Sequence, residues 1–136
     1  MRLSEAAGGG NRAARVETAM TPTAAIDAGA LFVYGSLLDA AHRASLLGRE
    51  VPGALARLAG YERLRGRYFY LVERAGATTD GLVLEGLDER DFAALDRYED
   101  VPRLYTRAVA VVTRADGTRR RCWVYLPTAK LLAAGA

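Results

Sequence analysis

The sequence predicts an α+β domain in which several β-strands build one core and two short helices pack beside it. Three patterns support this fold class: a continuous apolar run at 31–33, further aromatic and aliphatic runs of strand length, and a helical repeat at 88–99. The chain has 136 residues, enough for one core and too few for two domains. Hydrophobic residues make up 51% and charged residues 26%, the balance of a soluble globular protein.

The same composition sets expectations for location and partners. No apolar run approaches the roughly 20 residues that a membrane span requires, so we expect no membrane partner. The start of the chain has no hydrophobic segment behind a basic one, and Cys122 is the only cysteine. A single cysteine excludes an internal disulfide and fits a reducing compartment. We therefore expect a cytoplasmic protein, and the sequence leaves its oligomeric state open.

Arginine carries almost all of the positive charge. The net charge is +3, and Lys130 is the only lysine. The one local basic cluster, Arg119–Arg121, follows the hairpin signal Asp116-Gly117 and lacks the interleaved aromatic residues of single-strand binders. We interpret it as the solvated start of a strand and expect no nucleic-acid partner. His42, beside Arg43 on what we expect to be an exposed helical face, has no second His or Cys at ligand spacing, so no metal site is predicted.

The two ends of the chain differ in composition from its middle. Residues 1–29 show no periodicity and contain the breakers Gly8–Gly10 and Thr21-Pro22, so we predict a disordered N-terminal extension. Met20 is a second candidate for the translation start. The domain is expected to span 30–128, followed by a tail, 129–136, that could form a turn of helix.

The first predicted strand ends in a glycine turn. Leu31–Val33 is apolar throughout, as in a strand buried on both faces, and Gly35 and Ser36 follow it. Such a turn presents several backbone N–H groups to one point, which suits an anion or an oxyanion. The pattern is also that of an ordinary strand-to-loop exit, and it leaves both interpretations open. Asp39 then caps a short helix at 40–47, which Gly48 ends.

Period-two patterns place the other strands. Alternation around Gly53 and Gly60 predicts one bent strand or two short ones at 51–64. Further strands are expected at 68–72, where Tyr68 and Tyr70 would serve core packing, and at 81–85, with a turn at 75–79 between them. Two last strands, at 105–113 and 122–126, flank the Asp116-Gly117 hairpin.

The helix at 88–99 has the clearest boundaries. Asp88 is the predicted N-cap, with Asp91 three residues later as in a capping box, and Leu87, Phe92 and Leu95 share one face. Its C-terminal end carries the carboxylates of Glu99 and Asp100, although the helix dipole there favours cations. These groups are therefore either solvated or held for a function.

Two separate motifs together resemble the γ-glutamylcyclotransferase superfamily, particularly its small AIG2-like or γ-glutamylaminecyclotransferase branch. The first is Tyr34-Gly35-Ser36-Leu37, and the second is Leu95-Asp96-Arg97-Tyr98-Glu99, followed by Pro102 and by Tyr105-Thr106-Arg107. The resemblance extends from Leu31 to Leu126 and implies a mixed, curved β-sheet or small barrel. One departure is Asp100, where the family usually has glycine.

The resemblance also implies an activity and a site. Tyr34, Gly35, Ser36 and Leu37 would bind the γ-glutamyl group, and Glu99 would act as general acid/base in an intramolecular aminolysis that releases 5-oxoproline and an amine. The partner is then a small γ-glutamyl compound, and the reaction needs no cofactor.

Arg107, Tyr105 and Tyr125 are further candidates for substrate contact, although Arg107 could equally pair with a structural acid. We expect the helix terminus, enclosure and the like charge of Asp100 to raise the pKa of Glu99.

Two rival interpretations are carried forward. Ser36 as a nucleophile is disfavoured, because no G-x-S-x-G elbow surrounds it and His42 would be its sole base. A non-catalytic binding or regulatory member of the same fold stays open because of Asp100. The sequence does not indicate which amine is released.

Overall fold

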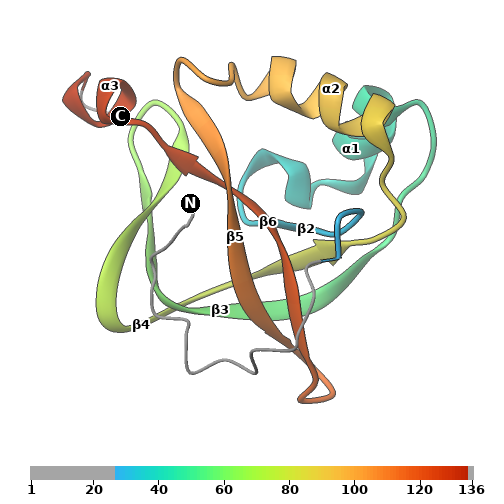
Figure 1. Cartoon of the computed structure of the whole chain (residues 1–136), viewed down its shortest axis with the longest axis horizontal. Helices are drawn as coiled ribbons and strands as arrows, with labels where there is room; N and C mark the ends of the chain where they lie inside the picture. Colours follow the sequence, from blue (N-terminus) through green and yellow to red (C-terminus); the bar gives the residue numbers. More distant parts are fainter. Residues whose placement is uncertain (1–26, 135–136) are drawn as a thin grey trace.

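The computed structural model describes residues 27–134 and shows a closed barrel of five strands in the order β2-β4-β3-β5-β6. Helices α1 and α2 lie together over the barrel, with α3 near the same end (Figure 1). The predicted fold class is confirmed: the two expected helices are α1 and α2, and α3 lies in the tail, where a turn of helix was expected. Met20 and residues 1–26 of the predicted N-terminal extension lie outside the described residues, whereas Asp27 and Gly29 form backbone hydrogen bonds with Arg121 and Leu87. The elements are β2 (Leu31–Val33), η2 (Ser36–Leu38), α1 (Ala40–Leu47), β3 (Gly53–Arg65), β4 (Phe69–Leu84), α2 (Glu89–Tyr98), β5 (Tyr105–Arg114), β6 (Arg119–Pro127) and α3 (Ala129–Ala133).

Strand β2 is the central strand of the fold. It pairs antiparallel with β4, where Phe32 faces Val83, and parallel with β6, where Phe32 faces Val124. The side chains of β2 are at most 3% exposed, which confirms a strand buried on both faces. Phe32 packs into the barrel interior, whereas Leu31 and Val33 face the helices. Strand β2 therefore lies between the two halves of the core, and the chain continues from its end into the loop at Tyr34.

The turn expected at 75–79 is wrong, because β4 runs unbroken from Phe69 to Leu84. Its partner β3 is also a single strand, and the pairing shifts between Ala59 and Tyr61. Gly60 and Gly76 both adopt a positive φ there, of 87° and 86°. Gly76, which lies inside the predicted turn, belongs to a β-bulge, and β3 continues to pair with β4 beyond it.

The long ribbon of β3 and β4 extends past the rest of the sheet. Strand β3 pairs with β5 only at Ala56 and Arg57, and β2 pairs with β4 only from Leu82 onward. Beyond these pairs, residues 61–65 and 69–73 form a two-stranded arm that ends in a tight turn at Gly66. This arm brings its turn to one mouth of the barrel.

Local capping signals fixed both main helices as predicted. The Asp39 side chain accepts a hydrogen bond from Ala41 N, and Gly48 closes α1 in the left-handed conformation. Asp88 and Asp91 form a reciprocal capping box at the start of α2. Phe92 and Leu95 of α2 are buried against the barrel.

The C-terminal end of α2 forms a tight turn in spite of the departure from glycine. Asp100 has a φ of 60°, a conformation that aspartate tolerates better than most side chains. Its N–H donates to Arg97 O, and Val101 N donates to Asp96 O, the two hydrogen bonds of a Schellman motif. Asp100 therefore keeps the turn that follows Glu99.

Substitution of Gly81 should destabilise the sheet that holds β2. A Cβ at Gly81 would lie 2.3 Å from Val33 O and 2.7 Å from Phe32 Cζ. We expect Gly81→Ala to lower the free energy of unfolding by about 2–3 kcal/mol, the upper range for overpacking, as measured by urea denaturation.

The matched control is Asp80→Ala at the neighbouring position. Asp80 is 77% exposed and pairs with Arg57, so its loss should cost less than about 1 kcal/mol. Equal destabilisation by the two substitutions would contradict the role given to Gly81.

Candidate active site

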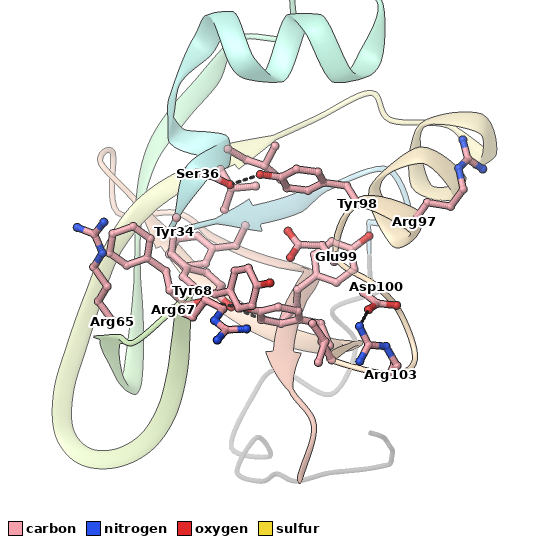
Figure 2. Close-up of a pocket in the computed structure, with 18 residues that line it drawn as sticks. Tyr34, Ser36, Arg65, Arg67, Tyr68, Arg97, Tyr98, Glu99, Asp100 and Arg103 are labelled. Carbon is pink, nitrogen blue, oxygen red and sulfur yellow. Dashed lines mark hydrogen bonds and ion pairs between the residues drawn. The ribbon is translucent and has the colours of Figure 1, made fainter. Parts of the chain in front are cut away.

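A cavity of about 560 Å³ opens at the mouth of the barrel, within the size range of small-molecule sites. Its walls come from the loop after β2, the turn between β3 and β4, the end of α2 with the turn that follows, and the ends of β5 and β6 (Figure 2). The lining residues used below are Tyr34, Gly35, Ser36, Leu37, Arg65, Arg67, Tyr68, Phe69, Arg97, Tyr98, Glu99, Asp100, Arg103, Tyr105 and Tyr125.

The loop Tyr34–Leu37 is held firmly at its start. The Tyr34 hydroxyl donates to Tyr125 O at 2.5 Å, and Tyr34 O accepts from Arg63 Nη1 at 2.8 Å. Tyr34 is buried, and its burial, with nearby Tyr105 and Glu99, raises the pKa of the phenol well above its usual value. A Cβ at Gly35 would lie 3.1 Å from Phe69 Cβ, so the close approach of β4 favours glycine there.

Arg43 holds the other end of the loop, in contrast to the exposed helical face expected around His42. The Arg43 side chain is buried, and it donates to Leu37 O, Leu38 O and Val51 O at 3.0–3.1 Å. Three backbone carbonyls thus satisfy its guanidinium, which lets a charged residue occupy a core position. The loop cannot shift without breaking these bonds.

Tyr98 links the loop to α1. Its hydroxyl lies 2.7 Å from Ser36 Oγ and 2.8 Å from His42 Nε2, and the His42 and Tyr98 rings meet edge to face. The hydroxyl of Tyr98 therefore lies between Ser36 and His42 in the hydrogen-bonded chain. This arrangement further disfavours Ser36 as a nucleophile with His42 as its base.

Glu99 lies at the C-cap of α2, and its carboxylate points into the cavity (Figure 2). It forms no ion pair or side-chain hydrogen bond with any residue from 27 to 134. Burial, and to a lesser degree the charge of Asp96, raises the pKa of Glu99 from 4.5 to about 7. A carboxyl group with this pKa can accept and release a proton near neutral pH.

Asp100 does not tune Glu99 in the way expected from the sequence. The Asp100 carboxylate forms an ion pair with Arg103 at the rim of the cavity (Figure 2). The nearby charge that raises the pKa of Glu99 is that of Asp96. The left-handed turn directs Asp100 away from its neighbour, so adjacency in sequence did not bring the two charges together.

Arg107 lies outside the lining of the cavity. Its guanidinium packs between the rings of Phe92 and Trp123, 4.8 and 4.9 Å from their centres, and its Nε lies 3.2 Å from Asp96 Oδ1. The sequence left open whether Arg107 contacts the substrate or pairs with a structural acid, and in the structure it pairs with Asp96. Asp96 also accepts from the Tyr125 hydroxyl at 2.7 Å.

Tyr105 and Tyr125 both line the cavity, and protein groups already accept hydrogen bonds from their hydroxyls. Tyr105 donates to Phe69 O at 2.6 Å, and Tyr125 donates to Asp96. Burial raises the pKa of both phenols, so both stay neutral near pH 7. The two residues therefore offer ring surface to a ligand.

Sequence reasoning missed the turn between β3 and β4 as part of the site. Three residues of this turn line the cavity: Arg65, Arg67 and Tyr68. Tyr68 was expected to pack in the core, but it is 45% exposed. Gly66, between two arginines, was the available signal for a turn at this point.

Among residues 27–134, no group of three or more His, Cys, Asp or Glu side chains could hold a metal ion. None of the helices in this part of the chain is long and apolar enough to cross a membrane.

Relatives identify the family. Residues 31–134 match the family described as gamma-glutamyl cyclotransferase, AIG2-like. A protein of Methanocaldococcus jannaschii named "Gamma-glutamylcyclotransferase and putative RNase" is 25% identical over 99 residues. This match covers 71% of the chain and 45% of the relative, so the chain spans less than half of that protein.

Solved structures share the fold. An Arabidopsis thaliana protein is 26% identical with a TM-score of 0.68, covering 81% of this chain and 75% of that one. An AIG2-like protein of Mus musculus is 24% identical with a TM-score of 0.58, covering 75% and 78%. A solved gamma-glutamyl cyclotransferase is 18% identical with a TM-score of 0.66, covering 74% and 66%; the last two likenesses concern the fold alone.

The barrel with a cavity at its mouth is the gamma-glutamyl cyclotransferase fold. The chain belongs to the AIG2-like gamma-glutamyl cyclotransferase family.

The raised pKa of Glu99 predicts a pH dependence of stability. Between pH 4.5 and about 7 the folded protein keeps a proton at Glu99 that the unfolded chain releases. The free energy of unfolding should therefore fall as pH rises through this window, by at most about 3 kcal/mol. Glu99→Gln should abolish this fall, as measured by urea denaturation at pH 5 and pH 8.

The control for this experiment is Asp100→Asn, which removes the neighbouring charge and should keep the fall of the wild type. If Glu99→Gln and the wild type lose the same stability between the two pH values, Glu99 does not titrate as stated.

Proposed function

We propose that this protein converts a γ-glutamyl amine or γ-glutamyl amino acid to 5-oxoproline and the free amine. The family membership supports the reaction class, and the cavity supplies a site for a small substrate. The observation that carries the proposal is the Glu99 carboxyl group, which points into this cavity with a pKa of about 7. The RNase in the relative's name is not part of the proposal, because the chain spans 45% of that protein.

The reaction is an intramolecular aminolysis. The α-amino nitrogen of the substrate attacks its own γ-carbonyl carbon, a C–N bond forms to close a five-membered ring, and the original amide C–N bond breaks. Two protons leave the α-ammonium nitrogen, one before it attacks and one as the ring amide forms, and both end on the released amine in its ammonium form, so the atoms balance without water, an oxidant or a reductant. Holding the substrate bent, with its α-amine near its γ-carbonyl, can lower the barrier by several kcal/mol, since intramolecular positioning contributes up to about 7–11 kcal/mol.

Each part of the site has a proposed role. Glu99 takes the proton of the α-ammonium group and later donates a proton to the leaving nitrogen. Backbone N–H groups of Tyr34–Leu37 hold the α-carboxylate or the developing oxyanion. Arg43 and Tyr98 position this loop, because they bond its carbonyls and the Ser36 hydroxyl. The rings of Tyr105 and Tyr125 form the wall beside the reacting atoms.

The rival function is a non-catalytic binding module on the same fold. It rested on Asp100, which stands where glycine is usual in the family. Since Asp100 adopts the left-handed conformation and pairs with Arg103, the turn after Glu99 keeps its form. We therefore favour the enzyme.

Loss of the acid/base group should remove turnover and spare binding. We expect Glu99→Gln to lower kcat by about 10²- to 10⁴-fold, the usual contribution of general acid/base catalysis, and to leave the fold intact. The assay incubates the protein with a panel of γ-glutamyl amines and γ-glutamyl amino acids and detects 5-oxoproline. Asp100→Asn is the matched control and should keep most of the activity. Ligand binding without 5-oxoproline formation by the wild type would favour the non-catalytic module.

The pH profile should report the ionisation of Glu99. Activity needs the carboxylate as base, so kcat should rise with pH through an apparent pKa of about 7. Asp96→Asn removes a like charge and leaves Arg107 without its acid partner, and both effects should move the rise to lower pH. Asp100→Asn should leave it in place. The tuning is misassigned if Asp100→Asn moves the rise and Asp96→Asn does not.

A further inference from the structure

Arginine side chains dominate the charge of the cavity. Four arginines line it, together with the two acids Glu99 and Asp100. Arg103 pairs with Asp100, and Figure 2 shows Arg97 pointing away from the cavity. Arg65 lies over the Phe69 ring, 5.1 Å from its centre. The positive charge that stays available to a ligand therefore belongs to the turn between β3 and β4.

Arg67 is the available cation of this turn. It makes no hydrogen bond, ion pair or ring contact with the residues from 27 to 134, and its side chain is exposed. Tyr68, next to it, is also exposed at the mouth. A guanidinium group presents paired N–H donors that match a carboxylate, so an unpaired arginine at a binding cavity suits an anionic ligand group.

We propose that Arg67 binds a carboxylate on the leaving amine, so that γ-glutamyl amino acids are preferred to γ-glutamyl amines that lack an acid group. This inference rests on the proposed function. It goes further by specifying the preferred leaving group, which carries a negative charge.

The depth of the cavity separates the two halves of the substrate. Tyr34 and Leu37, at 6% and 3% exposure, mark the inner end, where the γ-glutamyl group is assigned. Arg67 and Tyr68 are exposed and mark the outer end. With the γ-amide at Glu99, the leaving group extends toward the turn. When the leaving group is an amino acid, its carboxylate is one carbon away from the amide nitrogen of the substrate and so lies on the side of Arg67. A cationic leaving group would instead be repelled by the positive charge of Arg67.

Three substrates of similar size test this preference. γ-Glutamyl-alanine has an anionic leaving group, γ-glutamyl-ethylamide lacks only the carboxylate, and γ-glutamyl-(2-aminoethyl)amide has a cationic leaving group. We expect kcat/KM to fall in this order by roughly fivefold at each step, as for an exposed ion pair. Added salt should narrow the differences, since exposed charges are screened.

Charge reversal at Arg67 should invert the order. Arg67→Glu is expected to turn over γ-glutamyl-(2-aminoethyl)amide faster than γ-glutamyl-alanine. The matched control is Arg90→Glu, which makes the same change of charge on an exposed side chain of α2 that does not line the cavity, and it should keep the wild-type order. Rates for all three substrates are measured as 5-oxoproline formed.

The outcomes distinguish this inference from the proposed function. If the wild type forms 5-oxoproline equally fast from all three compounds, or if Arg67→Glu slows all three by the same factor, the inference is overturned and the cyclotransferase activity stands. If none yields 5-oxoproline, the proposed function fails. The preference is then decided by calorimetric binding of the same compounds to Glu99→Gln, where equal affinities would overturn it.

Discussion

The burial of β2 between two partner strands is the constraint on which the site depends. A strand of three residues, Leu31–Val33, contributes little pairing, yet it closes the barrel because it bonds to β4 on one side and to β6 on the other. Its side chains belong to both halves of the core. The loop that follows leaves at the barrel mouth, where the Tyr34 hydroxyl donates to Tyr125 O of β6 and the Arg43 guanidinium of α1 donates to Leu37 O of the loop. The scaffold therefore presets the position of this loop.

The environment of Glu99 shows an opposition between stability and chemistry. A carboxylate at a helix C-terminus faces the unfavourable end of the dipole, and Glu99 has no ion-pair partner among residues 27–134. Its neighbour Asp96 has two partners, the Tyr125 hydroxyl and Arg107. The protein thus pairs Asp96, which lies outside the cavity, and leaves the Glu99 carboxyl group inside the cavity without a partner among the described residues. Such an arrangement is common where a group must exchange protons.

Sequence patterns were sufficient where neighbours in the chain decide the structure. The capping box of Asp88 and Asp91 and the apolar run of β2 were predicted because their signals are local. Sequence patterns failed where residues distant in the chain decide the local structure. Gly76 indicates a turn by itself, but pairing with β3 makes it part of a bulge. The burial of Arg43 depends on carbonyls from two other segments, and the two interpretations left open for Arg107 are separated only by its pairing with Asp96 of another element. The motifs identified Glu99 as the candidate acid, whereas the arginines of the cavity required the turn at Gly66 to be located in space.

The two-stranded arm formed by 61–65 and 69–73 affects how copies of the protein meet. An exposed strand edge offers unpaired N–H and C=O groups on which another chain can add a strand. Here charged side chains along the arm oppose such pairing, among them Arg63, Arg65, Glu73 and the ion pair of Arg74 with Glu62. The Tyr105 hydroxyl also donates a hydrogen bond to Phe69 O at the start of β4, so this carbonyl is not free to pair with another strand. The charges of the arm, of which Arg65 also borders the cavity, therefore oppose edge-to-edge aggregation, and replacing several of them by apolar residues would lower solubility.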